Sequence, residues 1–255
     1  IIGIKKMKFS IITATYNRAD TIVRALSSVK NQTYKNIELV VIDGDSKDNT
    51  IDVISHLIST EDMVYSSPDY GIYDALNKGI KSASGDIIAF LHSDDLYFDE
   101  NVLSFIADVF VDESIDIVYG DVCFFSGMDE NNIIRTYKSD QLNLKNLAWG
   151  KMPAHPAIFC RRKVFETLGG FKLDYKIAAD YEFLCRLVKK SNFTSKYVNK
   201  NLVRMQTGGA SRISLKNTAL LNREVYRAIK TNGIYTNYFM IFSKYASKLL
   251  QFLKS

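Results

Sequence analysis

Strands and helices alternate along the first 91 residues, and this alternation restricts the fold more than any other feature of the sequence. Continuous apolar stretches rich in branched side chains predict strands, and apolar residues spaced three or four apart predict helices. Because the connections are short, we expect a parallel sheet with helices on both faces. The predicted strands cover 8–15, 37–46, 63–67 and 86–91, and the predicted helices cover 21–32, 48–59 and 71–84.

The pattern changes at about residue 115, where strands at 115–125 and 133–138 follow each other without a helix between them. This predicts an antiparallel addition to the sheet. Further predicted elements are a strand-like segment at 153–162 leading into a helix, a helix at 178–191 and a strand at 195–206. We therefore expect one α/β domain over residues 1–213 and a C-terminal helical extension over 214–255. Met7 resembles a natural initiator, so we expect residues 1–6 to be an addition to the natural chain.

Composition limits the classes of protein and partner. A hydrophobic share of 47% in 255 residues is ordinary for a globular core. The net charge of +5 suits an anionic substrate or membrane surface, and the absence of a dense Lys/Arg stripe argues against nucleic acid. Three scattered cysteines, Cys123, Cys160 and Cys185, predict free thiols in a reducing compartment. The sequence contains no apolar run of about 18 residues, so it predicts no transmembrane helix.

Two adjacent carboxylates, Asp94 and Asp95, follow the predicted strand in "GDIIAFLHSDD". In open α/β sheets, ligands bind at the carboxyl ends of the strands. A divalent cation there would offset the repulsion between the two charges, and Mg²⁺ or Mn²⁺ suits oxygen ligands. Taken alone, the motif is more typical of a solvated loop that caps the following helix.

The other strand ends of this half are also polar, with "TYN" after the first strand and "DGDS" after the second. These segments are expected to converge on the same edge of the sheet. The sequence contains neither G-x-G-x-x-G nor G-x-x-x-x-G-K-[ST]. Bound phosphates would therefore be held by a metal and by side chains.

Four motifs in this order resemble glycosyltransferase family 2, the inverting enzymes of the GT-A fold. They are "SIITATYNRADTIVRALSSVKNQTYKNIELVVIDGDSKDNT", "DYGIYDALNKGIKSASGDIIAFLHSDD", "HPAIFCRRKVFETLGGF" and "AADYEFLCRL". The resemblance spans about residues 8–211. It implies a Rossmann-like mixed sheet, and "D-x-GIYDALNKGI" is most similar to bacterial members that build surface polysaccharides.

The resemblance implies a nucleotide-sugar site. Asp95 would contact the metal, and Asp94 the ribose or the metal; His92 replaces the first Asp of the common D-S-D-D form. Asp43 would read the base, since a carboxylate can accept the N3–H of uracil; otherwise it is a turn residue. Lys78 fits the nucleotide site and a solvated helix equally well. The remaining residues expected around the nucleotide are Thr13, Ala14, Thr15, Tyr16, Asn17 and Asp69.

An inverting transfer needs a base that accepts the proton of the acceptor hydroxyl. Asp180 matches the family's base, and the helix N-terminus on which it lies favours its ionised form. Glu182 is the neighbouring alternative, turned away from Asp180 on a helix. His155 is either a ligand of the site (diphosphate, acceptor or metal) or a structural residue. Arg212, after "TGGAS", is either a residue that closes over the diphosphate or part of a linker.

We therefore expect a metal-dependent inverting glycosyltransferase that moves a sugar from a nucleotide donor, with UDP expected, to a saccharide or polyprenyl-linked acceptor in the cytoplasm. A sugar-phosphate nucleotidyltransferase and a non-catalytic nucleotide-sugar-binding module are the alternatives. The first normally needs glycines after the first strand, and "TATYNRAD" has none. Residues 234–255 are broadly apolar with flanking lysines, which suits peripheral contact with the inner membrane face or packing on this domain or on a second subunit. The oligomeric state stays open.

Overall fold

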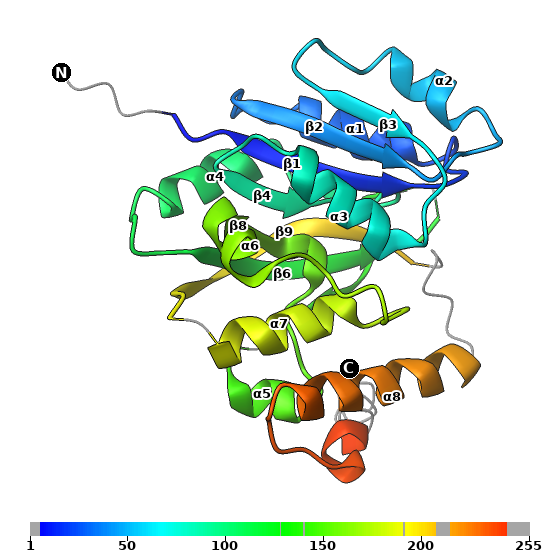
Figure 1. The fold of residues 1–255 in the computed structure, drawn as a ribbon. Helices are drawn as coiled ribbons and strands as arrows, with labels where there is room; N and C mark the ends of the chain where they lie inside the picture. Colours follow the sequence, from blue (N-terminus) through cyan, green and yellow to red (C-terminus); the bar gives the residue numbers. More distant parts are fainter. Residues whose placement is uncertain (1–5, 128, 140, 191, 208–214, 244–255) are drawn as a thin grey trace.

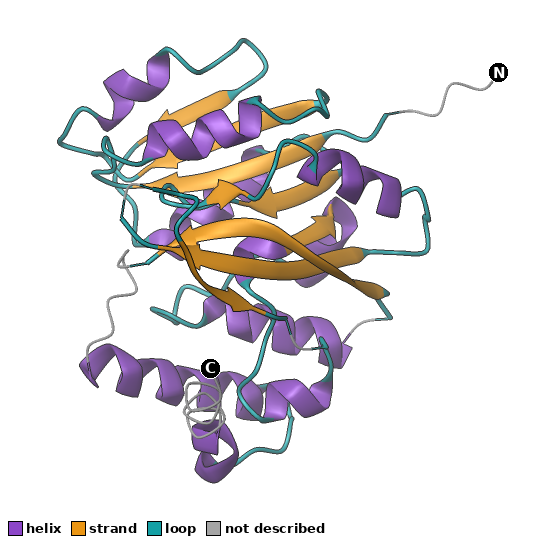
Figure 2. Cartoon of the chain, turned by 180° about the vertical axis from the view of Figure 1, so that it is seen from behind, coloured by secondary structure: helices purple, strands orange, loops and turns teal. Residues whose placement is uncertain are grey.

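The structure is a computed structural model that describes residues 6–127, 129–139, 141–190, 192–207 and 215–243. Within these residues, nine strands form one mixed sheet in the order β3-β2-β1-β4-β8-β6-β9-β5, and β7 pairs with β6. Helices cover both faces of the sheet (Figures 1 and 2). The α/β architecture expected from the sequence is confirmed.

The first half of the sheet is parallel, as the alternation predicts. Phe9 pairs with Ile37 on one side and with Ile87 on the other, so β1, β2 and β4 start and run together. The strands are β1 (Phe9–Thr15), β2 (Ile37–Asp43), β3 (Met63–Ser66) and β4 (Ile87–Phe90). The helices between them are α1 (Ile22–Lys30), α2 (Thr50–Ser55) and α3 (Ile72–Ser82).

The second half is mixed. As expected, β7 (Ile133–Tyr137) runs antiparallel to β6 (Ile117–Phe125). Other pairings and elements were not predicted: β8 (Ile158–Arg161) is also antiparallel to β6, β9 (Ser195–Gln206) lies parallel to β6, β5 (Leu96–Tyr97) pairs with β9, and α4 (Val102–Val109) follows β5. The remaining elements are α5 (Leu144–Ala148), the 3₁₀ turn η1 (His155–Ala157), α6 (Arg162–Leu168) and α7 (Ala179–Lys190).

Two cores, one on each face, hold the sheet. Alternating side chains of β1 divide between them: Ile12 joins the core under α3, α6 and α7, and Ile11 joins the core under α1 and α4. This division follows from the period of two along a strand. A parallel sheet buried on both faces explains why its strands read as continuous apolar runs.

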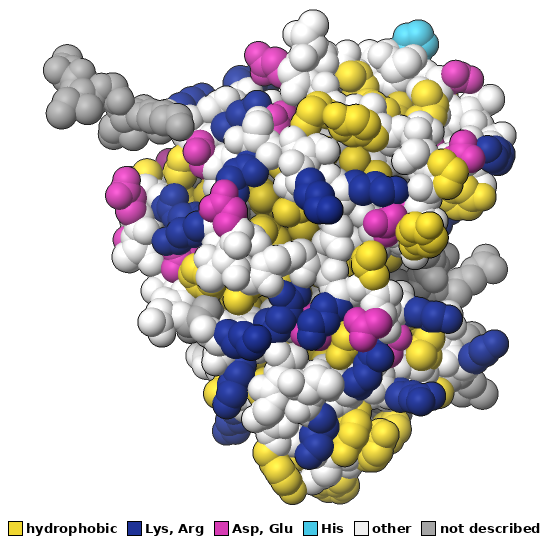
Figure 3. Space-filling view, viewed as in Figure 1, with side chains coloured by type: hydrophobic (Ala, Val, Ile, Leu, Met, Phe, Trp, Pro, Cys, Tyr) yellow, Lys and Arg dark blue, Asp and Glu magenta, His cyan; other side chains and the backbone are white. Residues whose placement is uncertain are grey.

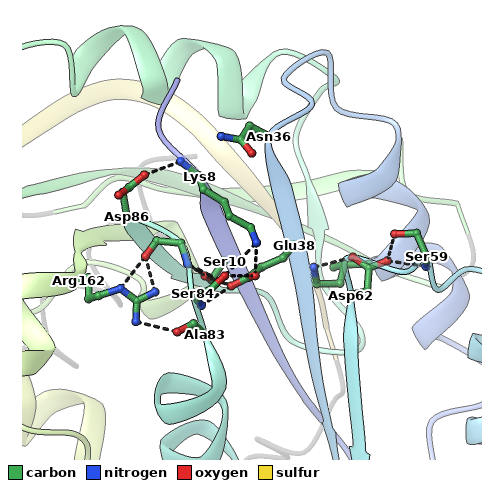
Figure 4. A network of polar contacts seen from close by, with 12 residues as sticks. Lys8, Ser10, Asn36, Glu38, Ser59, Asp62, Ala83, Ser84, Asp86 and Arg162 are labelled. Carbon is green, nitrogen blue, oxygen red and sulfur yellow. Dashed lines mark hydrogen bonds and ion pairs between the residues drawn. The ribbon is translucent and has the colours of Figure 1, made fainter. Parts of the chain in front are cut away.

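At the strand ends opposite the acidic segments, a polar network joins β1, β2 and the turn before β4 (Figure 4). Glu38 of β2 is buried and accepts hydrogen bonds from the side chains of Ser10 and Ser84, and Lys8 Nζ lies 2.6 Å from Glu38 Oε2. These contacts lower the pKa of Glu38 to about 2 against the effect of burial. A Cβ on Gly85 would lie 2.7 Å from backbone atoms of Lys8 and Ser10, so this position requires glycine.

The C-terminal helix α8 (Leu215–Thr231) packs along α7 (Figure 1). Its Val225, Ala228 and Ile229 are buried in the core that also contains α3 and α7. A short helical turn at 238–243 follows, where Ile241 joins the same core. Within the described ranges, no helix is long and apolar enough to cross a lipid bilayer.

Candidate functional site

The carboxyl ends of β1, β2 and β4 lie at one edge of the sheet because the three strands are parallel and in register. Thr15, the last residue of β1, lies directly opposite Asp43, the last residue of β2. On the other side of β1, the amide of Leu91, just after β4, donates to Ile12 O at 3.1 Å. The polar segments that follow these strands are therefore brought together, as the strand order requires.

Asp43 is buried at this edge, and its carboxylate is fully engaged. Oδ2 accepts from the Ser46 amide at 2.9 Å and from Ser66 Oγ at 2.6 Å, and Ser46 Oγ donates to Oδ1. A nucleobase that binds Asp43 must therefore share this carboxylate with the two serines.

The loops after β1 and β2 are joined by hydrogen bonds. Asn17, in the left-handed region at φ 50°, accepts from the Lys47 amide at 2.8 Å, and its own amide donates to Ser46 Oγ at 2.8 Å. The amide of Arg18 donates to Thr50 Oγ1 at 2.8 Å. Tyr16 lies in the loop that these hydrogen bonds fix. It is 55% exposed, so its ring is available to pack against a ligand.

Asp69 lies next to these loops. A Cβ on Gly44 would lie 2.7 Å from Asp69 Oδ2 and 3.4 Å from the Tyr16 ring, so the glycine permits the close approach of both side chains. Lys78, in contrast, turns back on its own segment, 3.1 Å from Asp74 Oδ2 and 3.1 Å from Pro68 O.

The three residues of β1 at this edge are buried. Ala14 is 9% exposed, and the hydroxyls of Thr13 and Thr15 have no hydrogen-bond partner among the described residues. These residues belong to β1, which lies between β2 and β4 in the sheet.

Asp95 is the most unusual carboxylate of the site. It is 3% exposed, and Oδ2 has no hydrogen-bond partner in the part of the chain that the structure describes. Burial and the neighbouring charge of Asp94 raise the pKa of Asp95 well above its usual range, opposed by the backbone amide of Gln206. Leu96 pairs with Arg204 of β9, so Asp95 is held between the ends of β4 and β9.

This arrangement fits a divalent cation, which would satisfy the buried oxygen of Asp95 and neutralise the pair. Among the described residues, no group of three or more His, Cys, Asp or Glu side chains is placed to hold a metal. Asp94 and Asp95 could thus supply only part of the ligands. Phosphate oxygens and water would have to supply the rest, as is common for Mg²⁺.

His155 packs next to Phe90 and His92, which come shortly before the acidic pair in the chain. Its ring stacks on Phe90 at 4.8 Å between centroids and lies 5.8 Å from the His92 ring. Burial lowers the pKa of His155 to about 3, helped by His92, so the ring is neutral. Nε2 has no hydrogen-bond partner within the described residues. The ring is thus part of the packing, with one nitrogen left for a ligand.

Asp180 lies half-buried in the first turn of α7. Its Oδ1 accepts from the Tyr181 amide at 2.8 Å and from the Tyr73 hydroxyl at 3.2 Å. Burial raises the pKa of Asp180 to about 6, although both hydrogen bonds oppose the shift. A carboxylate with this pKa accepts protons near neutral pH more readily than an ordinary Asp.

Glu182 forms a buried ion pair and has a structural role. It is fully buried, 2.9 Å from Arg186 Nε and 2.8 Å from Lys172 Nζ. As a buried ion pair it stabilises the packing of α7 and is not positioned as the base.

An aromatic cluster links the end of β4, which precedes the acidic pair, with Tyr73, the hydrogen-bond partner of Asp180. Phe171 lies 5.4 Å from Phe90 and 5.6 Å from Tyr73, between ring centroids. Tyr73 was missed as a site residue, although it lies within the motif "GIYDALNKGI" at the start of α3. Arg212 lies outside the described residues.

The chain is similar in sequence to known proteins. The family model described as glycosyl transferase family 2 matches residues 10–169. A PGL/p-HBAD biosynthesis glycosyltransferase of Mycobacterium bovis is 31% identical over 198 residues, covering 75% of this chain and 73% of the relative. The Escherichia coli UDP-Glc:alpha-D-GlcNAc-diphosphoundecaprenol beta-1,3-glucosyltransferase WfgD is 30% identical over 189 residues, covering 73% and 72%.

Solved structures show the same fold at low identity. S. aureus TarS 1-349 in complex with UDP-GlcNAc has a TM-score of 0.66 and 18% identity, covering 88% of this chain and 66% of that one. The mannosyltransferase PcManGT from Pyrobaculum calidifontis, in complex with GDP-Man and Mn²⁺, has a TM-score of 0.60 and 16% identity, covering 96% and 80%. The chain spans only 40% of a longer TarS chain.

The mixed sheet with an acidic carboxyl edge therefore places the molecule in the class of GT-A proteins. Within that class, the chain belongs to glycosyl transferase family 2. The family expected from the sequence motifs is confirmed, and membership in it disfavours the nucleotidyltransferase alternative.

Proposed function

We propose that this protein is an inverting glycosyltransferase that moves a sugar from a UDP-sugar to a saccharide or lipid-linked saccharide acceptor. The observation that carries the proposal is the buried oxygen of Asp95, beside Asp94 at the carboxyl edge of the sheet, for which the described residues offer no hydrogen-bond partner. The donor is supported by the nucleotide sugars in the names of WfgD and the TarS complex. The acceptor class is supported by the lipid-linked saccharide that WfgD's name prints.

Asp94 and Asp95 would hold Mg²⁺ or Mn²⁺ together with the donor diphosphate. The ion, when bound, acts as a Lewis acid that stabilises the charge of the departing UDP. Asp43, Asp69 and the exposed ring of Tyr16 would border the nucleoside, on the loops that Asn17 holds together. Thr13, Ala14 and Thr15 would form the floor of that pocket. Lys78 and His155 stay candidates for contact with the diphosphate.

Asp180 would act as the base. In a single in-line displacement the acceptor oxygen forms a bond to the anomeric carbon while the bond to the UDP oxygen breaks, and the hydroxyl proton passes to the Asp180 carboxylate. The Tyr73 hydroxyl and the Tyr181 amide hold Oδ1, which leaves Oδ2 for the acceptor.

We place the protein in the cytoplasm, in contact with the inner membrane face. Its three cysteines are free and buried, which suits a reducing compartment. Large aromatic side chains are exposed after α8: Tyr235 at 73%, Tyr238 at 48%, Phe239 at 78% and Phe242 at 50%. Hydrophobic side chains gather at the lower end of the molecule with Lys and Arg side chains near them (Figure 3), which is complementary to an anionic bilayer.

Release of UDP from a panel of UDP-sugars, with Mn²⁺ and lipid-linked acceptors, tests the activity. We expect Asp180→Asn to lower turnover by about 10²–10⁴-fold while donor binding persists. Asp174→Asn, an exposed carboxylate in the preceding loop, serves as the matched control. Full turnover in Asp180→Asn would reject the base, and binding of UDP-sugars without turnover in the wild type would favour the non-catalytic module.

Sedimentation with vesicles tests the membrane contact. We expect binding to vesicles that contain anionic phosphatidylglycerol, weak binding to pure phosphatidylcholine, and loss of binding in the double variant Tyr235→Ser, Phe239→Ser. Equal sedimentation of wild type and variant would reject this surface, and a dimer that dissociates in the variant would assign it to a second copy.

A further inference from the structure

The start of α7, which carries Asp180, is held by a residue from α8. Glu224 is 6% exposed and accepts three backbone hydrogen bonds. Oε1 accepts from the Lys176 amide at 2.9 Å, and Oε2 accepts from the amides of Ile177 at 2.9 Å and Ala178 at 3.0 Å. These three residues come directly before Ala179, the first residue of α7. Glu224 therefore fixes the segment that leads into α7, from a position at least 46 residues later in the chain.

Arg227 strengthens the same contact, because it lies three residues after Glu224 and so on the same side of α8. Its Nη2 donates to Asp174 O at 2.7 Å, and its guanidinium lies 3.8 Å from the centroid of the Tyr175 ring. Glu224 and Arg227 together thus bind residues 174–178, the segment that leads into α7.

Tyr73 holds this segment from another element. Its hydroxyl is 2.6 Å from Ile177 O and 3.2 Å from Asp180 Oδ1. The peptide units around Ile177 are therefore fixed by α8 through their N–H groups and by α3 through a C=O group. Asp180 follows three residues after Ile177.

We propose that Glu224 is a positioning residue for Asp180, and that α8 is thereby a working part of the active site. The Glu224 carboxylate fixes the backbone of 176–178, and this backbone fixes where the first turn of α7 presents Asp180. The proposal rests on the role proposed above for Asp180 as the base. It assigns a function to α8, which lies beyond the region 10–169 that the family model matches.

Glu224 also affects Asp180 through its charge. Glu224 is the negative charge that adds to burial in raising the pKa of Asp180, and Tyr73 from α3 and the Tyr181 amide of its own helix oppose it. Glu182 on the same helix is matched by Lys172 and Arg186. Removing the charge of Glu224 should therefore lower the pKa of Asp180 as well as loosen its backbone.

The test compares Glu224→Gln with Asp174→Asn in the full chain. Both substitutions remove one carboxylate from the contact between α8 and the 174–178 segment, but Asp174 accepts no bond from the amides of 176–178. Two quantities are measured without any substrate: hydrogen exchange of the 176–178 amides, and titration of ¹³C-labelled Asp180, assigned by its absence in Asp180→Asn.

We expect Glu224→Gln to speed exchange at 176–178 by about tenfold, since a glutamine offers one acceptor oxygen in place of two. The Asp180 midpoint should fall by about half a pH unit, and Asp174→Asn should change neither. If Glu224→Gln does not fold, Glu224→Asp, which keeps the charge but shortens the reach, should speed exchange without lowering the midpoint.

Unchanged exchange at 176–178, or an unchanged Asp180 midpoint in Glu224→Gln, would overturn the proposal. Turnover of UDP-sugar then separates the two ideas. If both physical quantities change as expected and turnover does not, Glu224 positions Asp180 but Asp180 is not the base, so the proposed mechanism fails and the positioning contact stands.

Discussion

At the scale of single residues, the protonation of Asp180 governs how activity should depend on pH. Burial raises its pKa to about 6, and only the ionised form can accept the acceptor proton. We therefore expect kcat/KM for UDP release to rise with pH up to about 6 and to level off above it. A profile that levels off near pH 4, where an ordinary Asp titrates, would contradict this environment.

The same shift predicts a change in stability. Because the pKa of Asp180 is higher in the folded chain than in the unfolded chain, ionisation destabilises the fold as pH rises from about 4 to about 6. Asp180→Asn should therefore raise the free energy of unfolding at pH 7 by about 1 kcal/mol, allowing for its partial exposure. Thermal melts at pH 7 and pH 3.5 check this, since the advantage should vanish at the lower pH.

Asp95 offers a test of metal binding that needs no turnover. Its Oδ2, which has no hydrogen-bond partner within the described part of the chain, should be satisfied by a cation, so Mn²⁺ with UDP should raise the Tm of the wild type by mass action. We expect Asp95→Asn to remove most of that rise. Asp108→Asn on α4, away from the acidic pair, is the control. A rise of equal size in Asp95→Asn would show that the ion binds elsewhere.

The sequence could predict which residues carry the chemistry, because Asp94, Asp95 and Asp180 lie in motifs that can be read along the chain. It could not predict their surroundings. Ser66, which donates to Asp43, is the last residue of β3 and lies 23 residues later in the chain, and the hydroxyl that donates to Asp180 comes from a helix 107 residues earlier in the chain. Such contacts depend on the assembled sheet.

At the scale of elements, the Glu38 network fastens β2 to β1 and to the turn before β4 (Figure 4). The pKa of Glu38 is lowered to about 2, so its contribution to stability is present above about pH 4.5 and is lost as pH falls toward 2. We expect Glu38→Gln to destabilise the fold by about 3 kcal/mol at pH 7. Urea unfolding measures this, with the exposed Glu166→Gln as control; a loss no larger than the control's would contradict it.

The elements predicted from the sequence were those with clear local patterns. The four parallel strands and their helices follow from runs of apolar residues and from helical spacing. The pairing of β5 with β9 did not, because β5 has two residues and its partner lies more than 100 residues later. The parallel pairing of β6 and β9 likewise depends on how the intervening helices fold back.

At the scale of the whole molecule, the main difference between sequence and structure concerns α8. A break in pattern near residue 214 suggests a separate extension, since amphipathic spacing does not reveal which surface a helix will cover. In the structure α8 covers α7 (Figure 1), and its buried side chains enter the core that underlies the site. The domain limits of 1–213 and 214–255 stay a prediction, and they can be tested directly.

Removing residues 215–255 should destabilise the whole chain, not merely shorten it. Val225, Ala228 and Ile229 are almost fully buried, and burial of such side chains contributes about 5 kcal/mol together, a large share of typical domain stability. The amides of 176–178 would also lose Glu224. We expect the shortened chain to lose cooperative thermal unfolding, whereas the full chain with Tyr235→Ser and Phe239→Ser should keep it. A shortened chain that melts cooperatively at the wild-type temperature would establish 214 as a true domain boundary and would exclude α8 from the active site.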